Sequence, residues 1–505
     1  MMPSDGALWT DVALELSAQG FVPKLWLGQW QFDEFVKSNF PECEILLLKE
    51  FHNSIPSTPV KFLPDAHYMT SSEFYRLKNQ AFKMMDRQEE TRNFGRLERE
   101  SYFYSKFTQL YSLITEHKIG ALVSGEAPHG VANLMAYRIC ESLGIPTYHI
   151  GSNSFVPLLH VQRGFSEPPL KVVGDPEIEE HLTILVGALN EYKNGIPTPL
   201  YMENQAKFDK QYSFATVLYK YWKHLLVIRI KPHLGATYTP KHDLSVRSRF
   251  PWQVNKRAWF APFLIRKLRS TLEAEYSKQA DDFSFSSQHA PKFVYFPLPY
   301  EPERTSNPEG GDFYEAVDAL IALRNFLPED IHIFVKEHPS QFSKKLLGFK
   351  GRSPYIYKVL KTLPNVRLVG LGTSSSDLVE HSEFVCCLTG TAALESVLVG
   401  KKGIVFGAPW FYSVPGIHVF HTIKNYESFS KEPTYSLAEI CAAVVKELPT
   451  YSIPGSPATS QQNYFRQKFG DAVDRLMPID RTVRLLVDTI VDDFEQSPTT
   501  KPRLR

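Results

Sequence analysis

The chain has 505 residues, more than one hydrophobic core usually supports, so at least two domains are expected. Hydrophobic residues make up 43% and charged residues 22%, an ordinary globular mix that excludes a disordered or fibrous chain. Lys and Arg total 56 against 55 Asp and Glu, and this net charge of +1 excludes the broad positive surface of a nucleic-acid-binding protein.

Cysteine usage and the lack of a targeting pattern favour a cytoplasmic protein. The five cysteines are odd in number and lie mostly in apolar runs, as expected of reduced thiols. The first residues, MMPSDGALWTDVALEL, contain no basic region followed by an apolar stretch, so we expect no signal peptide. No uninterrupted apolar run approaches the roughly 20 residues that span a bilayer. Any membrane contact would be peripheral, at the inner face of the cytoplasmic membrane.

Helix and strand patterns alternate at short intervals between residues 8 and 150, which is typical of a parallel sheet covered by helices. In chain order we predict a helix at 9–19, strands at 25–28 and 44–48, a long helical stretch at 74–117, a strand at 119–124, a helix at 131–143 and a strand at 145–150. Residues 1–200 are therefore predicted to form an N-terminal Rossmann-like domain.

Residues 201–290 are predicted to form an insertion between domains. From Tyr219 to Arg269 the chain contains twelve Lys and Arg residues among aromatic ones, and Asp243 is its single acid. Such a segment could rest on anionic lipid, where each cationic residue gains about 1 kcal/mol. The alternative is a solvated insertion without a partner.

The alternation returns after residue 291. We predict strands at 293–297, 331–335, 366–368, 384–388 and 403–406, with helices at 313–326, 355–363 and 392–399. Residues 291–455 are therefore predicted to form a second doubly wound, Rossmann-like unit. Residues 456–505 are predicted to contain two helices, at 461–494, and a frayed tail.

A candidate anion site follows the strand at 331–335. Side chains alternate along a strand, so Lys336 and His338 are expected on one face and Glu337 on the other, before Pro339 ends the regular structure. The carboxyl edge of a parallel sheet is where open α/β sheets bind ligands. A phosphate there could accept hydrogen bonds from two cationic side chains. Alternatively, His338 only ends the strand and Lys336 is solvated.

A second anion-compatible loop follows the strand at 384–388. Gly390 permits a tight turn, while Thr389 and Thr391 supply hydroxyl groups where a helix begins and its free amides face outward. Glu395, one turn into that helix, could accept hydrogen bonds from ribose hydroxyls. A plain strand-to-helix turn is the alternative, and the functional interpretation rests on the pairing of the two loops in one sheet.

Three further loops could reach the same edge. Residues 373–376 offer the hydroxyl of Ser375 before a short helix, with a simple helix cap as the alternative. Residues 297–301 end the first strand of the C-terminal unit and are expected to point toward the other domain. Residues 406–412 could wall a base or sugar with aromatic rings, although ordinary packing explains them equally well.

The N-terminal unit offers candidate catalytic residues in SGEAPHG, at 124–130. Glu126 and His129 follow an apolar strand and would face the other domain across a cleft. Glu126 could act as a general base on an acceptor hydroxyl or as a nucleophile, and His129 could orient the acceptor or exchange a proton. The alternative is a helix start with Glu126 near the positive end of the dipole.

Together these motifs resemble the capsule polysaccharide biosynthesis family, the Kdo-transferase-like proteins of bacterial surface glycan pathways. The resemblance rests on FPLPYEPE, FVKEHPSQF and LTGTAALESVLVGKKGIVFGAPWFY, with SGEAPHG and LGIPTYHI upstream. It implies a GT-B-like α/β fold with two Rossmann-type domains facing a cleft, in which residues 1–200 form the acceptor-side domain and residues 291–455 the nucleotide-sugar-binding domain. It also implies transfer of a Kdo- or sialic-acid-like sugar from a CMP donor to a glycan or glycolipid acceptor, without metal or cofactor. His338, Pro339 and the loop 389–391 would contact the CMP phosphate.

One departure from the family pattern concerns the start of the chain. Members normally open with a hydrophobic strand, whereas only MMPSDGA precedes the first helix here. We therefore expect that the first strand of the domain is lost, that the start is misassigned or that the fold is altered. Two other functions fit the same pattern. One is a glycerophosphate or ribitol-phosphate polymerase that uses a CDP donor, and the other is a non-catalytic subunit of a capsule assembly complex.

Overall fold

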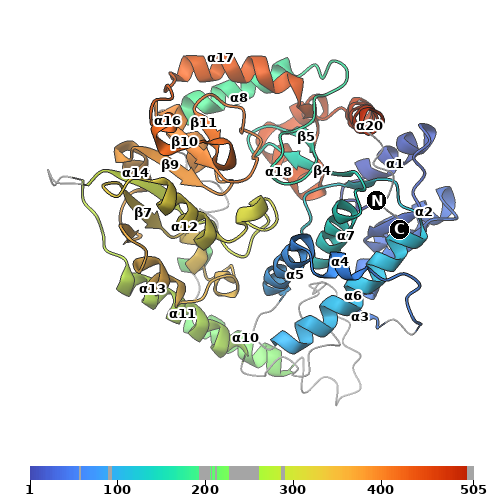
Figure 1. The fold of residues 1–505 in the computed structure, drawn as a ribbon, viewed down its shortest axis with the longest axis horizontal. Helices are drawn as coiled ribbons and strands as arrows, with labels where there is room; N and C mark the ends of the chain where they lie inside the picture. The colour runs from blue at the N-terminus through green and yellow to red at the C-terminus, as the bar shows by residue number, and fades with distance from the viewer. Residues whose placement is uncertain are drawn as a thin grey trace.

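The structure, a computed structural model, describes residues 1–55, 58–88, 94–192, 205, 207–210, 213–226, 261–285 and 291–497. It contains two α/β units, drawn mainly blue to cyan and yellow to orange in Figure 1. Residues 227–260, which make up most of the basic segment 219–269, lie outside the described residues. In the described part of the chain, no helix combines the length and the apolar character needed to cross a membrane.

The C-terminal unit is built on a six-stranded parallel sheet in the order β11-β10-β9-β6-β7-β8. Its strands are β6 (Phe293–Pro297), β7 (His332–Lys336), β8 (Val366–Val369), β9 (Phe384–Cys387), β10 (Lys402–Val405) and β11 (Ile417–Val419). In β6, Val294 and Phe296 enter one hydrophobic cluster while Phe293 and Tyr295 enter another. Both faces of the sheet are therefore covered, as predicted for a doubly wound unit.

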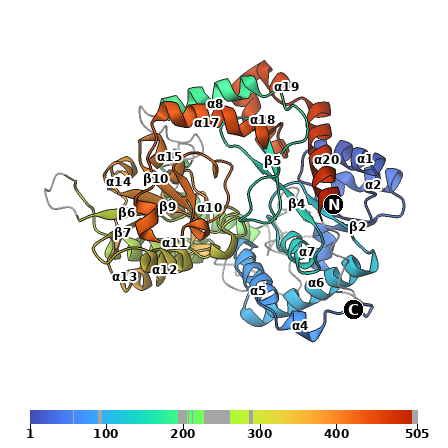
Figure 2. The ribbon, with the colours of Figure 1, turned by 45° about the horizontal axis from the view of Figure 1, so that its top comes forward.

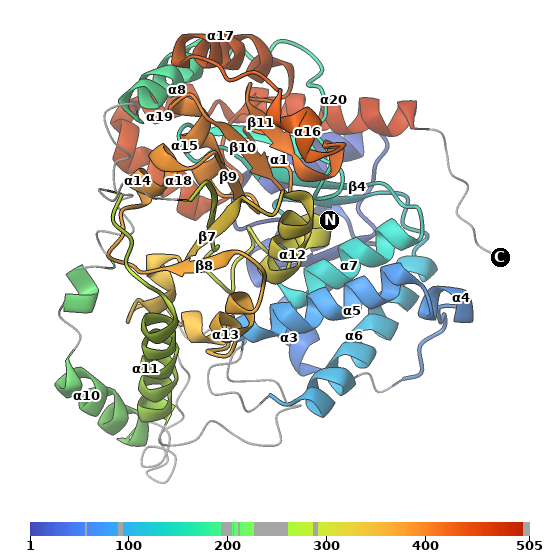
Figure 3. The same cartoon turned by 60° about the vertical axis from the view of Figure 1, so that its left-hand side comes forward.

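Helices of this unit follow the predicted positions with small shifts. They are α10 (Phe214–Leu225), α11 (Ala261–Gln279), α12 (Ala316–Phe326), α13 (Ile356–Lys361), α14 (Ser375–His381), α15 (Ala392–Leu398), α16 (Tyr426–Ser430) and α17 (Leu437–Glu447). The helix predicted from 313 begins at Ala316, because residues 311–313 form a tighter 3-10 turn. In Figure 3, α10 lies at the far end of α11, away from the sheet.

The N-terminal unit carries a mixed sheet whose two parts are joined by the first residues of the chain. Its strands are β1 (Leu25–Gly28), β2 (Glu44–Leu47), β3 (Leu122–Ser124), β4 (Thr147–Ser152), β5 (Leu158–Gln162) and β12 (Ile453–Pro454). The Leu27 amide donates to the Met1 carbonyl, and Met2 bridges Ser124 in parallel. The expectation that the first strand is missing is therefore wrong in part: Met1 and Met2 occupy its place between β1 and β3.

Helices α1 (Leu8–Ala18), α2 (Asp33–Asn39), α3 (Leu48–Asn53), α4 (Ala66–Met69), α5 (Ser72–Met85), α6 (Arg96–Glu116) and α7 (Val131–Ser142) cover this sheet. The single helical stretch predicted at 74–117 is wrong, since it is divided into α5 and α6. The N-cap of α5 is Ser71, whose hydroxyl accepts from the Phe74 amide. The overlooked signal for the division was Gly95, which interrupts the charged pattern and is the N-cap of α6.

The chain crosses between the units in both directions. Helix α8 (Glu179–Tyr192), within the predicted N-terminal domain, packs through Leu185 and Leu189 in the same cluster as Ile440 of α17. The tail contains three helices instead of the predicted two: α18 (Thr459–Phe469), α19 (Val473–Leu476) and α20 (Ile479–Gln496). Helix α20 returns to pack on α1, beside the N-terminal sheet (Figure 2).

A buried ion pair fixes the loop that follows β6 against the N-terminal unit. Lys83 of α5 lies 3.0 Å from Glu301 and 2.8 Å from Glu315, and the Glu301 side chain is 1% exposed. The Asn307 side-chain amide also donates to the Gln80 carbonyl at 3.0 Å. Removing one partner of a buried pair leaves an uncompensated charge, so this contact sets how the loop approaches the cavity between the units.

Candidate active site

A cavity of about 980 Å³ lies between the two units. One side is formed by residues at the carboxyl ends of β6, β7 and β9, and the other by β4, β5 and Gln461 of α18. Eight predicted donor-side residues line it: Lys336, His338, Pro339, Ser375, Thr389, Gly390, Thr391 and Glu395. Residues 297–300 and 408–411 line it as well. The carboxyl ends of parallel strands meet at one edge, so the two anion-compatible loops are brought together.

The imidazole of His338 is held in one orientation. Its Nδ1 accepts from the Ser340 amide at 3.1 Å, so in the neutral ring the hydrogen is on Nε2. Burial, with the nearby Arg352 charge, lowers the pKa of His338 to about 4. At pH 7 His338 therefore offers a neutral N–H donor instead of the second cation that the sequence suggested.

Lys336 supplies the positive charge beside this ring. Its side chain is buried, and Nζ donates to the Thr373 carbonyl at 2.5 Å and to Ser375 Oγ at 3.0 Å. Burial lowers the pKa of Lys336, while Asp282 and Asp377 act against that shift. The ammonium thus joins the end of β7 to the start of α14, and one of its three hydrogens is left uncommitted by these bonds.

Glu337 points away from His338, as the strand alternation predicts. Its carboxylate is paired with Arg352 at 3.0 Å and accepts from the Tyr357 hydroxyl at 2.8 Å. It also accepts from the His338 amide at 3.0 Å. Burial raises the pKa of Glu337, with Arg352 opposing the rise. This carboxylate is a structural anchor that fixes the point where the chain leaves β7.

The loop 389–391 is held by hydrogen bonds to its neighbours. No close packing contact requires a glycine at position 390. Thr389 donates to the Thr305 carbonyl at 2.7 Å, which ties this loop to the one after β6. A Cβ at Gly390 would meet Cys387 at 3.7 Å, an ordinary contact. Thr391 does not cap α15 with its side chain, because its hydroxyl donates to Glu395 Oε1 at 3.2 Å. Burial raises the pKa of Glu395.

The predicted catalytic pair does not line the cavity. Glu126 Oε2 lies 2.8 Å from Arg304 Nη1, and Arg304 also lies 2.8 Å from Glu309. Burial raises the pKa of Glu126, and the Arg304 charge opposes that shift. His129 is exposed, and its carbonyl accepts from Arg87 at 2.9 Å. Glu126 therefore helps to hold Arg304, the residue that does line the cavity.

The lining residues that sequence reasoning missed include Arg304, His149, His160 and Gln162. The signal for the last three was present, because polar residues at alternate positions interrupt two otherwise apolar strands. The signal for Arg304 was absent, since it lies in an irregular loop whose path depends on the contact with α5.

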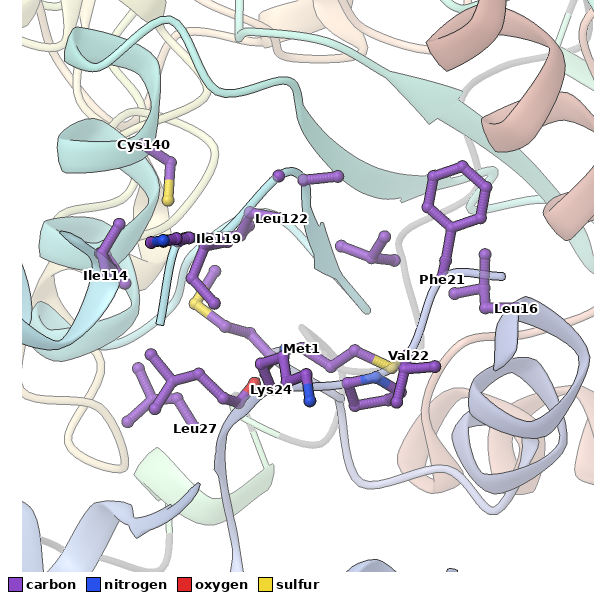
Figure 4. A pocket seen from close by; sticks show the side chains of 18 of the residues that line it. Met1, Leu16, Phe21, Val22, Lys24, Leu27, Ile114, Ile119, Leu122 and Cys140 are labelled. Atoms are coloured by element: carbon purple, nitrogen blue, oxygen red, sulfur yellow. Dashed lines mark hydrogen bonds between the residues drawn. The ribbon is translucent and has the colours of Figure 1, made fainter. Parts of the chain in front are cut away.

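A second cavity, of about 260 Å³, lies at the opposite, amino-terminal edge of the N-terminal sheet. Figure 4 shows its apolar lining, including Met1, Phe21, Ile119 and Leu122, with Lys24 at one side. Its lining does not combine the donors and carboxylates that surround His338. The larger cavity is therefore the candidate active site.

The fold and the cavity together define a GT-B-like protein: two Rossmann-like units face each other, and phosphate-compatible groups lie at the carboxyl edge of the C-terminal sheet. Residues 279–448 match the family described as capsule polysaccharide biosynthesis protein. The matched region contains the whole six-stranded sheet and all eight of the donor-side residues.

Solved structures give weaker comparisons. A Thermosulfurimonas dismutans KpsC, beta Kdo 2,7 transferase, is 19% identical, with 35% of this chain and 51% of that chain covered and a TM-score of 0.21. The beta Kdo 2,4 transferase of KpsC from the same organism is 16% identical over 61% and 74%, with a TM-score of 0.22. The glycotransferase of kitacinnamycin is 13% identical over 92% and 98%, with a TM-score of 0.20.

The match to the first of these structures spans about half of that protein, and at these TM-scores the likenesses carry no argument about activity. No curated protein sequence matches the chain.

Proposed function

We propose that the protein is a glycosyltransferase of surface or capsular polysaccharide biosynthesis that takes an acidic, Kdo- or sialic-acid-like sugar from a CMP donor. The observation that carries the proposal is the convergence of His338, Lys336 and the loop 389–391 on one cavity between the units. The family match over residues 279–448 supports the same class of pathway.

The donor phosphate is assigned to the space beside His338. The Nε2 hydrogen of His338 is a donor toward an anion, and the Lys336 ammonium adds a fixed positive charge from the same strand end. A charged oxygen strengthens such hydrogen bonds. When the bond between the anomeric carbon and the phosphate breaks, these groups would stabilise the charge on the leaving CMP.

The ribose is assigned to the neighbouring Glu395. Its Oε1 already accepts from Thr391, and no described residue hydrogen-bonds Oε2. A carboxylate oxygen can accept from either hydroxyl of a ribose. Burial raises the pKa of Glu395 and so favours its neutral form. Hydrogen bonds from a pair of ribose hydroxyls would act in the opposite direction and favour the ionised carboxylate.

A donor screen tests the proposal directly. Purified protein is incubated with CMP-Kdo, CMP-sialic acid, CDP-glycerol and a UDP-sugar control, and nucleotide release is measured with and without glycan acceptors. CMP release from the acidic sugars supports the proposal. Release of CMP from CDP-glycerol alone would replace it with phosphoalditol transfer, and no release from any donor would favour a binding subunit.

Metal independence is part of the proposal. Lys336 and the His338 donor would take the place that a divalent cation has in other phosphate sites. CMP release should therefore be unchanged by EDTA. A loss of activity that Mg²⁺ or Mn²⁺ restores would contradict this part while leaving the donor assignment standing.

We also propose that α10 rests on an anionic membrane, where a lipid-linked acceptor would be presented. Val217 and Tyr221 face α11, whereas Leu218, Tyr219 and Trp222 on the other side are exposed. Exposed Lys223 adds charge complementary to anionic lipid.

Sedimentation with vesicles tests this membrane contact. Binding to phosphatidylglycerol-containing vesicles should exceed binding to pure phosphatidylcholine and should fall in Trp222→Ser. Trp30→Ser is the matched control, because Trp30 is also exposed but lies on the N-terminal unit. Equal binding to both vesicle types would contradict the proposal.

A further inference from the structure

The wall of the cavity opposite His338 has a polar face and an apolar face. In the antiparallel pair of β4 and β5, His149 lies opposite Gln162, and Gly151 lies opposite His160. These four residues share one face, which lines the cavity. The residues between them, including Tyr148, Ile150, Leu159 and Val161, pack in the cluster that contains α1 and α20. The polar residues of β4 and β5 therefore face the cavity, and the apolar residues between them face the hydrophobic core.

Hydrogen bonds determine which nitrogen of His160 carries the hydrogen. The side-chain amide of Gln162 donates to the Glu167 carbonyl at 2.9 Å and to the Ala408 carbonyl at 3.2 Å. Both of its hydrogens are then used, so its Oε1 is the acceptor in the 3.1 Å contact with His160 Nε2. The hydrogen of a neutral His160 is on Nε2, and Nδ1 carries a lone pair. No described residue donates to that Nδ1.

Gly151 allows the imidazole to lie across β4. A Cβ at residue 151 would be 2.0 Å from His160 Nε2 and 2.4 Å from its Cε1. Any side chain there would displace the ring from Gln162. Burial lowers the pKa of His160 to about 4, so the ring is neutral at pH 7 and its Nδ1 lone pair carries no proton.

We propose that His160 is the catalytic base and that the β4–β5 face is the acceptor subsite, an inference that rests on the proposed glycosyltransferase function. The acceptor hydroxyl gives its proton to His160 Nδ1, and its oxygen forms a bond to the anomeric carbon of the donor. The bond from that carbon to the phosphate oxygen breaks, and its electron pair leaves with CMP. Lys336 and His338 Nε2–H receive the leaving phosphate on the opposite side.

The three carboxylates around Arg304 are less suited to this step. Glu126 is paired with Arg304 outside the lining, and Glu309 is paired with the same guanidinium at 2.8 Å. Glu303 accepts from the Arg304 amide at 2.8 Å. Each of these groups is engaged by Arg304, whereas the lone pair of His160 is not committed to a protein donor.

The same wall defines the class of acceptor. Of the described lining residues from β4 and β5, none carries a formal charge when the histidines are neutral. Ser154 and Gln461 add further hydrogen-bonding groups, and Trp410 adds an aromatic ring. Such a surface fits the hydroxyl-bearing ring of an uncharged sugar. The strands of this wall supply no cation to neutralise a phosphate or carboxylate on the acceptor, and the neighbouring Arg304 is already paired with Glu126 and Glu309.

CMP release from CMP-Kdo, with water as the acceptor and corrected for spontaneous hydrolysis, tests the base. In His160→Ala we expect release to fall about 100-fold or more, the usual contribution of a general base. CMP affinity measured by calorimetry should stay within about threefold of wild type, and added imidazole should restore part of the activity. A purely structural role would not produce this rescue.

The matched control is His181→Ala, which removes another buried histidine, one that contacts the Leu476 carbonyl outside the cavity. It should keep wild-type release and gain nothing from imidazole. Gly151→Ala provides a second variant that keeps residue 160 and displaces its ring, and its release should fall with CMP affinity retained. Wild-type release in His160→Ala, or a loss without imidazole rescue, overturns the inference. Absence of release by the wild type with every donor overturns the proposed function instead.

Discussion

His338→Ala provides the sharpest test of the phosphate site. The substitution removes the Nε2 hydrogen that is oriented by the 3.1 Å bond from the Ser340 amide to Nδ1. A hydrogen bond to a charged group contributes about 1.5–3 kcal/mol, and each 1.4 kcal/mol is about a tenfold change in affinity. CMP should therefore bind roughly 10- to 150-fold more weakly. The fold should survive, because the ring is only half-buried at the rim of the cavity.

Isothermal titration of CMP measures this loss, and thermal unfolding checks the fold. His332→Ala is the matched control, because His332 lies at the opposite end of the same strand and does not line the cavity. It should bind CMP as wild type does. CMP affinity in His338→Ala within threefold of wild type would refute the assignment of the phosphate to this ring, as would an equal loss in His332→Ala.

Three further results are expected. Because the pKa of His338 is lowered to about 4, the affinity for a CMP-sugar should not change between pH 6 and pH 8. An increase in affinity on acidification with a midpoint near pH 6.5 would show that the imidazolium binds instead. Lys336→Met should weaken CMP binding by more than tenfold and lower the free energy of unfolding by about 1–3 kcal/mol, seen in urea titrations, because the Thr373 carbonyl loses its donor. Arg304→Met should destabilise the protein more than Glu126→Gln in the same titrations, because it leaves two carboxylates without their partner. Equal losses of stability in the two variants would contradict the assignment of Arg304 as the shared partner of Glu126 and Glu309.

The course of the chain in the C-terminal unit was predictable from sequence. Strand and helix periods, together with prolines and small residues between them, predict the parallel strands and place Lys336, His338 and Gly390 at strand ends. Parallel strands share a carboxyl edge, so residues more than fifty positions apart could be expected at one site. The opposite orientation of Glu337 also followed from alternation along a strand.

Local patterns did not determine the contacts between units. Helix α8 was predicted with the N-terminal domain because it follows it in sequence, yet its leucines pack beside α17. Glu126 and His129 were predicted to be catalytic from their place after a strand, whereas Glu126 instead contacts Arg304 from the other unit. No local periodicity encodes such a pair, since its partners are 178 residues apart.

The sequence by itself determined the strands, their exposed ends and the residue types placed there, because these depend on backbone preferences and side-chain alternation over a few positions. Only the tertiary structure decided protonation and pairing. It shows that His338 is neutral, that Arg304 forms an ion pair with Glu126, and that the His160 ring lies against Gly151 with one nitrogen hydrogen-bonded. Burial and long-range contacts set these properties, and both depend on how distant segments pack together.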